Sequence, residues 1–167
     1  EQDAAWSQQV GRLEIHGAAG DTLTDSGIYW AGPGTTKSDS TTKNTSGRYI
    51  KFECVKDGTF SLVFKSDGKN GSNYGRIYLT DGTELGPDCM FKDSNTHHVA
   101  NATASAQNSD TTLSCTVEAG KTYYIWAYMY NQATAKFWIS SISYAAAKSD
   151  YFPLTVTDEY GASSVTN

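Results

Sequence analysis

The sequence predicts an all-β fold, an antiparallel β-sandwich of jelly-roll type. Short segments that alternate apolar and polar residues recur along the chain, and this period of two indicates strands with one buried face. Asp-Gly pairs punctuate these segments, and they supply the positive φ that tight turns need. Charged residues make up only 19% of the chain, which holds 15 Gly and 11 Tyr. A composition of this kind is typical of secreted β-proteins.

The alternating segments give the expected strands in order. Along the strand expected at Arg48–Val55, Ile50, Phe52 and Cys54 face the core, while Tyr49, Lys51 and Glu53 face outward. The Asp-Gly turns at 57–58, 67–68 and 81–82 predict a meander, in which consecutive strands pair with one another. The long stretch 87–110 should contain one short strand, His97–Asn101, because structureless connections of such length are uncommon. The clearest strands are Gly11–His16, Arg48–Val55, Thr59–Ser66, Tyr74–Thr80 and Thr111–Val117.

With 167 residues, the chain suits one domain with a real core. We expect the sandwich to occupy residues 1–147, with Trp6 either plugging its N-terminal end or lying outside it. Residues 151–158 form a candidate last edge strand, since Pro153 bars them from a sheet centre. Residues 159–167 read as a tail or linker.

The segment Lys121–Tyr144 has the highest density of aromatic residues and reads as two strands joined by a short polar turn, a closing hairpin. Its first strand divides into two faces. One carries Tyr123, Ile125, Ala127 and Met129, and the other carries Tyr124, Trp126, Tyr128 and Tyr130. Only one face of a strand in a small sandwich must meet the core. One of these sets is therefore available for another purpose.

The order RYIKF, DGTFSLVF, RIYLTDG, TVEAGKTYYIW and FWISSISY resembles the β-sandwich modules appended to bacterial pectate lyases. It is similar in particular to the pectin-binding carbohydrate-binding modules of cellulosome-forming gut bacteria, and related modules occur in starch-binding proteins of such bacteria. The resemblance covers about the central hundred residues and excludes both ends of the chain. It implies a non-catalytic sugar-binding role without fixing the ligand.

Aromatic rings that are not needed in the core predict a sugar-binding platform, because stacking removes the apolar faces of sugar rings from water. The turn after Tyr130 is the favoured place, since the amides beside it can bond to hydroxyl groups. The alternative is that Tyr124 and Trp126 are core and Tyr128 closes the sandwich. Trp138 reads as core or half-buried rim. The candidate ligand-binding residues are Trp30, Tyr74, Trp126, Tyr128, Tyr130, Asn131, Gln132 and Lys136.

We favour a neutral plant glucan as ligand, with starch first and β-glucan or xyloglucan next, because the net charge is −5. The alternative is homogalacturonan held by Lys65, Lys69 and Lys136, which also read as solvated charges. An adhesin or scaffold domain is the rival class. We expect a monomeric module within a larger secreted or cell-surface protein.

Other functions find little support in the sequence. The net negative charge disfavours nucleic acid and anionic membranes, and no transmembrane run is present. No pair of carboxylates and no nucleophile motif suggests an enzyme. We predict no cofactor; loop aspartates could hold a structural calcium ion, and Asp93 with His97 and His98 is a weak candidate for a metal site. Cys54, Cys89 and Cys115 are an odd number, so at most one disulfide forms.

Overall fold

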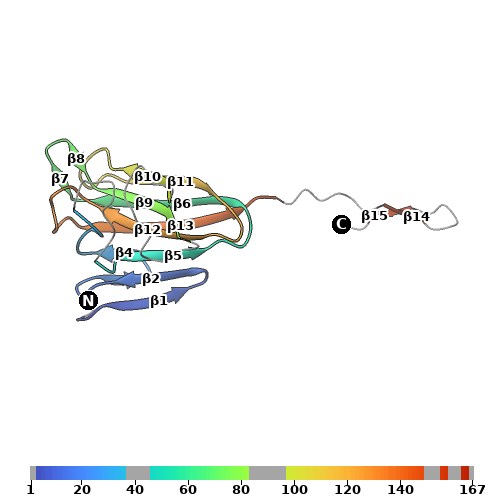
Figure 1. Cartoon of the computed structure of the whole chain (residues 1–167), viewed down its shortest axis with the longest axis horizontal. Coiled ribbons are helices and arrows are strands. Elements are labelled where there is room, and N and C mark those ends of the chain that lie inside the picture. Colours follow the sequence, from blue (N-terminus) through green and yellow to red (C-terminus); the bar gives the residue numbers. More distant parts are fainter. Residues whose placement is uncertain (1–2, 37–45, 83–96, 149–154, 158–162, 166–167) are drawn as a thin grey trace.

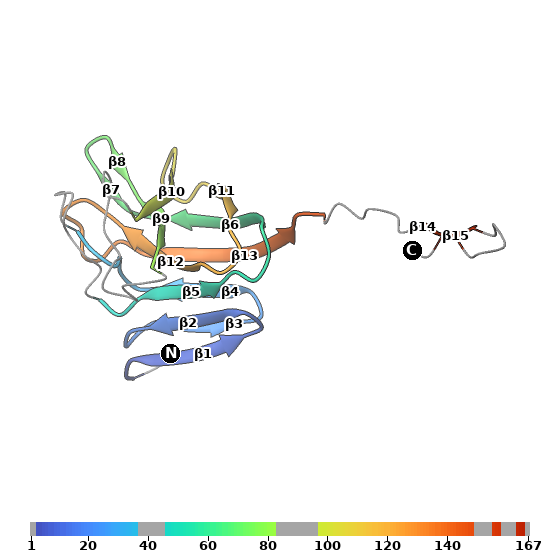
Figure 2. The same cartoon turned by 45° about the vertical axis from the view of Figure 1, so that its right-hand side comes forward.

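A computed structural model describes residues 3–36, 46–82, 97–148, 155–157 and 163–165 of the chain. Over these residues the regular elements are β-strands, and two large antiparallel sheets lie face to face (Figures 1 and 2). Over the same residues, no helix has the length and apolar character needed to cross a membrane. The predicted all-β sandwich is therefore confirmed.

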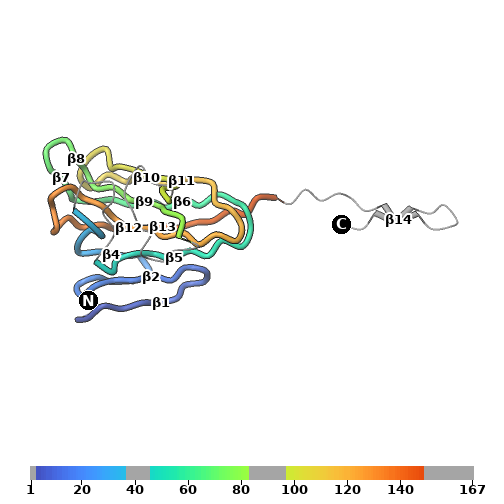
Figure 3. The backbone as a smooth tube through the Cα atoms, viewed as in Figure 1, coloured from blue at the N-terminus to red at the C-terminus, as the bar shows by residue number. Residues whose placement is uncertain are grey.

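The first sheet, sheet A, has six strands. In spatial order they are β1 (Trp6–Val10), β2 (Leu13–Gly17), β5 (Tyr49–Glu53), β12 (Thr122–Tyr128), β9 (Arg76–Asp81) and β10 (His98–Thr103). The path of the backbone in Figure 3 shows β1 and β2, in blue, at one edge of this sheet.

The second sheet, sheet B, has five strands. Their order is β11 (Thr111–Val117), β6 (Gly58–Ser66), β13 (Phe137–Ala146), β4 (Gly27–Trp30) and β3 (Thr22–Thr24). Two small hairpins complete the described elements. They consist of β7 (Lys69–Asn70) with β8 (Asn73–Tyr74), and β14 (Thr155–Thr157) with β15 (Ser163–Val165).

The main core fills the space between the sheets. The alternation along each strand sends one set of apolar side chains inward, as predicted for Ile50, Phe52 and Cys54, which are all buried. Of the two faces predicted for the segment 123–130, the one that carries Tyr123, Ile125, Ala127 and Met129 lies in this core. Trp6 packs against the core from the edge strand β1, a strand that the weak pattern of residues 1–10 did not predict.

The predicted meander is wrong. The chain after β5 turns at Asp57 and enters β6 in the other sheet, so β5 pairs with β2 and β12, while β6 pairs with β11 and β13. The segment Lys121–Tyr144 is likewise no hairpin, because β12 belongs to sheet A and β13 to sheet B. An Asp-Gly turn reverses the chain equally well within a sheet and between two sheets. The turn residues therefore did not reveal which strands pair.

The C-terminal segment also differs from the prediction. Residues 155–157 do form a strand, but they pair with residues 163–165 and with neither sheet of the sandwich. Residues 163–165, expected to be part of a tail or linker, supply the partner strand. By contrast, the short strand expected near His97–Asn101 is confirmed as β10, and the strand expected at 111–117 coincides with β11.

Candidate functional site

The outer face of sheet A, which points away from sheet B, carries an unusual number of aromatic rings. Strand β12 directs Tyr124, Trp126 and Tyr128 to this face, as their alternation with the core residues predicted. Strands β9 and β5 add further rings beside them. With Tyr130, which follows β12, we call this set the outer aromatic face; it consists of Tyr49, Tyr78, Tyr124, Trp126, Tyr128 and Tyr130.

Cross-strand pairing brings these rings into contact. Trp126 lies opposite Tyr78, and the two rings stack with centroids 5.0 Å apart and planes 19° apart. Tyr128 meets the Tyr78 ring edge-on at 6.1 Å. On the neighbouring strands, Tyr49 meets Tyr124 edge-on at 5.7 Å. Such offset and edge contacts are the favourable geometries for aromatic pairs.

Most of the outer aromatic face is closed to solvent. Tyr78, Tyr124 and Trp126 are at most 3% exposed, and Tyr128 is 7% exposed. The accessible rings lie at its two ends, where Tyr49 and Tyr130 are half-buried. Tyr49 also stacks on its cross-strand neighbour His16, with centroids 4.1 Å apart and planes 19° apart. The surface that a ligand can reach therefore begins at the Tyr49–His16 pair.

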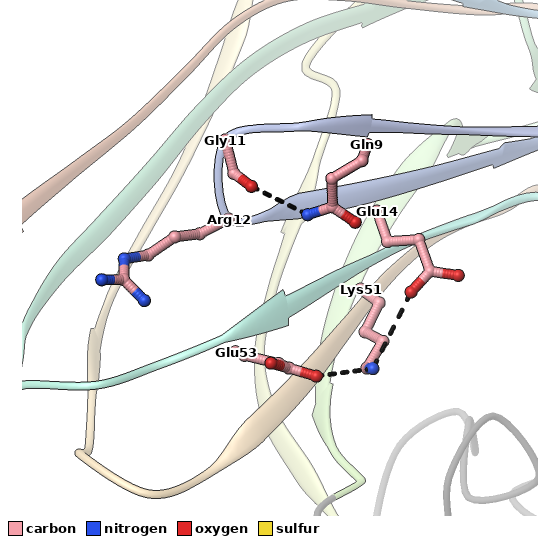
Figure 4. A pocket seen from close by; sticks show the side chains of 6 residues that line it. All are labelled: Gln9, Gly11, Arg12, Glu14, Lys51 and Glu53. Carbon is pink, nitrogen blue, oxygen red and sulfur yellow. Dashed lines mark hydrogen bonds and ion pairs between the residues drawn. The ribbon is translucent and has the colours of Figure 1, made fainter.

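An open polar cleft adjoins this pair through Glu14, which contacts His16. Figure 4 shows the residues that line the cleft. It has a volume of about 170 Å³ and lies over the edge strand β1 and its neighbours β2 and β5. The register aligns Gln9, Glu14 and Lys51 in one row, and the row continues to Tyr124 of the aromatic face. The cleft is lined by Gln9, Gly11, Arg12, Glu14, Lys51 and Glu53.

Ion pairs hold the polar groups of the cleft in place. Lys51 Nζ lies 2.6 Å from Glu53 Oε1 and 3.8 Å from Glu14 Oε2. The other oxygen of Glu14 lies 2.7 Å from His16 Nε2. The Gln9 side-chain amide donates to the carbonyl of Gly11 at 2.8 Å, while Arg12 turns its guanidinium away from the other five residues (Figure 4). Carboxylate oxygens and amide groups are thus fixed beside an accessible ring.

The electrostatics of the cleft favour binding over acid–base chemistry. The hydrogen bond between Lys51 and Glu53 raises the pKa of Lys51 and lowers the pKa of Glu53, so both groups stay charged at neutral pH. Burial, and then the neighbouring Glu14 carboxylate, raises the pKa of Tyr49, which keeps its phenol neutral. A general acid for glycoside hydrolysis needs a raised carboxyl pKa, and Glu53 has the opposite.

The turn after β12, favoured by the sequence, does bring together several predicted residues. Lys69 N donates to the Gln132 side-chain oxygen at 2.9 Å, and Asn70 Nδ2 donates to the Tyr130 carbonyl at 3.2 Å. Asn131 adopts a positive φ of 49°, which suits a turn. These contacts join the turn to the β7–β8 hairpin. The Gln132 amide oxygen therefore has a structural role.

The remaining predicted residues occupy different surroundings. The Nζ of Lys69 lies 5.7 Å from the ring centroid of Tyr74, which is half-buried against the core. Lys136 is exposed, and its backbone N–H donates to Asp67 Oδ1 at 2.7 Å.

Three predicted platform residues, Trp30, Trp126 and Tyr128, are buried in this structure, and Tyr128 keeps 7% exposure. Trp30 is fully buried in the main core, where its Nε1 donates to the His16 carbonyl at 3.2 Å. It ends β4 beside a loop, as expected, but its ring points between the sheets. Trp126 belongs to the outer face and stacks with Tyr78, yet its exposure is 0%. A ring without exposed surface offers no area for stacking on a ligand.

Sequence reasoning named Tyr49, Lys51 and Glu53 as outward residues but did not assign them a role. The alternation in RYIKFECV predicted that these three side chains face outward. It could not predict that Glu14 and His16 lie beside them, because this depends on the pairing of β2 with β5. Of the weak metal candidates, Asp93 lies outside the described residues, as does Cys89. His98 Nε2 lies 3.0 Å from Asn101 Nδ2, and the His98 ring meets Tyr78 edge-on.

The fold is similar to solved structures of a carbohydrate-binding module and of two xylanases. No family model and no curated protein matches the chain. A xylanase 10C from Cellvibrio japonicus in complex with xylopentaose is 13% identical, with a TM-score of 0.46, over 92% of this chain and 29% of that one. A "xylan-binding module CBM15" is 13% identical, with a TM-score of 0.42, over 87% of this chain and 98% of that one.

A third solved structure contains the CBM22-1 and GH10 modules of xylanase 10B from Clostridium thermocellum, complexed with xylohexaose. It is 10% identical, with a TM-score of 0.37, over 90% of this chain and 26% of that chain. This chain thus spans less than a third of both xylanase chains. Identities and TM-scores of this size do not by themselves define a ligand, so the function has to follow from the residues of this chain.

Proposed function

We propose that the protein is a non-catalytic carbohydrate-binding module that holds a plant polysaccharide against the outer face of sheet A. The observation that carries the proposal is the accessible Tyr49–His16 pair, which continues into the fixed polar row of Glu14 and Lys51. Together they offer a ring for the apolar face of a sugar and charged groups for its hydroxyls. Ligand-binding pockets in general combine apolar and aromatic side chains with a few well-placed polar groups.

Each part of this surface has a chemical role in the proposal. The Tyr49 ring would remove the C–H face of a sugar ring from water. Glu14 and Glu53 can accept hydrogen bonds from sugar hydroxyls, while Lys51 and Gln9 can donate them. The ion pairs already order these side chains, so little further ordering would oppose binding.

Among ligands we propose a neutral polysaccharide. Glu14 and Glu53 place two carboxylates at the cleft, where Lys51 already pairs with both and Arg12 turns its guanidinium away, and the chain carries a net charge of −5. Both features disfavour polyanions such as homogalacturonan. Starch-type α-glucan, then β-glucan or xyloglucan, remain our first candidates. Xylan joins them, since one of the solved structures above is a xylan-binding module. Such a module would act outside the cell, within a larger protein.

Affinity electrophoresis tests the proposal directly. The full chain is run in native gels that contain soluble starch, xyloglucan, β-glucan, xylan or polygalacturonate, beside a non-binding protein. We expect retardation in at least one neutral polymer and none in polygalacturonate. Retardation in none of the five gels would reject carbohydrate binding and would favour the adhesin or scaffold alternative.

Three tyrosine variants then locate the site. Tyr49→Ala should weaken retardation about tenfold, the loss expected for one well-placed ring. Tyr49→Phe keeps the ring and should bind as the original protein does. Tyr130→Ala removes the half-buried ring at the other end of the face and serves as the matched control. Loss of binding in Tyr130→Ala but not in Tyr49→Ala would move the site to the turn after β12.

A further inference from the structure

The outer face of sheet B carries a second pair of aromatic rings, on the opposite side of the sandwich. Tyr29 of β4 lies directly across from Trp138 of β13, and their ring centroids are 5.5 Å apart with planes tilted by 45°. The same row continues to Lys65 of β6 on one side and to Thr22 of β3 on the other. Four neighbouring strands therefore contribute one side chain each to a single row.

These two rings do not belong to the core. Tyr29 is half-buried between the buried residues Ile28 and Trp30, and Trp138 is half-buried between the buried residues Phe137 and Ile139. A register irregularity follows between Ile139 and Ser141. In a regular strand, Trp138 and Ile142 would point to the same face, because they are four residues apart. The irregularity turns Ile142 toward the core while Trp138 faces outward. The core is complete on both strands without either ring.

A groove runs beside the pair. It has a volume of about 430 Å³, and its lining combines the two rings with the hydroxyl-bearing residues Thr22, Thr24 and Ser140. Among the residues that the structure describes, no carboxylate lines it. Lys65 Nζ lies 5.9 Å from the Trp138 ring centroid, and over the described residues Lys65 forms no ion pair. The groove thus offers two rings, several hydroxyls and one available cation.

We infer that this groove is a second carbohydrate-binding site, separate from the one proposed on sheet A. The rings would stack on a sugar, and the threonine and serine hydroxyls would exchange hydrogen bonds with its hydroxyls. A docked protein fits the face less well, because the buried centre of a protein interface is usually a contiguous group of apolar and aromatic side chains. Beyond the two rings this sheet presents mainly Ser and Thr, such as Ser61 and Ser114, whose hydroxyl oxygens lie 2.8 Å apart.

Two sites on opposite sheets would allow one module to bridge two polysaccharide chains. The inference concerns a different surface from the proposed function, although both sites bind the same class of ligand. Titration with a short oligosaccharide of the retarding polymer should therefore give two sites per chain. It should give one site in Trp138→Ala and one in Tyr49→Ala.

The test compares full-length variants by calorimetric titration and by retardation in the gels described above. Trp138→Ala and Tyr29→Ala should each halve the number of sites per chain and weaken retardation, while the sheet A site remains. Thermal melting controls for folding, and binding at the sheet A site does so independently. Thr112→Ala, an exposed change elsewhere on the outer face of sheet B, is the control that should alter neither measurement.

The possible outcomes separate the two proposals. One site that Tyr49→Ala removes, while Trp138→Ala and Tyr29→Ala leave it unchanged, overturns the second site and keeps the first. One site that depends on Trp138 but not on Tyr49 overturns the first and keeps the second. Binding to none of the polymers overturns both.

Discussion

Replacing Asp21 by asparagine tests how the loop between β2 and β3 is anchored beside the proposed site. Asp21 is fully buried and accepts four hydrogen bonds. Its carboxylate receives the backbone N–H groups of Ala18 and Ala31, each at 2.7 Å, and the Arg48 Nε at 2.8 and 3.1 Å. Arg48 directly precedes Tyr49, so this contact also helps to position the first accessible ring of the outer aromatic face.

The expected cost follows from these contacts. Asp21→Asn keeps the volume and one acceptor, but it places an NH₂ group against groups that donate. Breaking a buried ion pair on one side costs about 3–5 kcal/mol. Because the Arg48 side chain is still 15% exposed, we take the lower end. We therefore expect a loss of about 3 kcal/mol in the free energy of unfolding and a drop in Tm of about 9 °C.

Urea unfolding, followed by tryptophan fluorescence, measures this loss, and calorimetry gives the Tm. Glu118→Gln is the control, since Glu118 forms an exposed pair with Lys121 and should leave Tm unchanged. Arg48→Gln completes a double-mutant cycle, in which the double variant should lose less than the sum of both single losses. An Asp21→Asn Tm equal to that of the original protein would show that the anchor does not stabilise the fold.

Three further predictions follow from single residues. Burial raises the pKa of Cys115 to about 11 from 9.0. At pH 8 the alkylation of Cys115, followed by peptide mass mapping, should therefore be about a hundredfold slower in the folded protein than in urea. Equal rates would contradict the burial. Gly27→Ala should lower Tm sharply and abolish the Trp138 site, because φ is +124° and a Cβ would overlap the Ile139 carbonyl. Gly71→Ala, with φ +62° and open space around it, should cost only about 1 kcal/mol. The hydrogen bond from Lys51 lowers the pKa of Glu53, so this pair stabilises the folded protein above the ordinary carboxyl pKa of 4.5. The stabilisation is lost as the pH falls through the lowered pKa of Glu53. In Lys51→Gln, the titration midpoint of Glu53, measured by NMR, should return upward.

The faces of the strands could be predicted from the sequence, whereas the partners of the strands could not. Alternation alone separated Tyr123 and Ile125 from Tyr124 and Trp126, and the structure confirms this division. Pairing is a long-range property, and the Asp-Gly turn at Asp57 is compatible with a hairpin and with a crossing between sheets. The row of Glu14, Lys51 and Tyr124 is formed by three strands that are not consecutive in the sequence, so no local sequence pattern predicts it.

The exposure of individual rings was the least predictable property. Trp30 follows an alternating strand and precedes a Gly-Pro loop, features that fit an accessible rim residue. Its burial depends on the His16 carbonyl, fourteen residues earlier in the chain. Trp138 takes the half-buried position, one of the two expected for it, and the irregularity after Ile139 turns the later residue Ile142 toward the core in its place. In both cases a distant contact or a shift in register decided the outcome, and periodicity reports neither.

The buried rings of the outer aromatic face have a role in the proposed mechanism although no ligand can reach them. Tyr78 stacked on Trp126 ties β9 to β12, and Tyr124 meets Tyr49 edge-on across the next pair of strands. Tyr49 is therefore held between Tyr124 and His16, and it has little freedom to rearrange. A ring fixed in this way loses little entropy when a sugar stacks on it, so more of the contact energy remains as affinity. On this argument, Tyr124→Ala should weaken binding without removing any group that touches the ligand, and Tyr124→Phe should restore it.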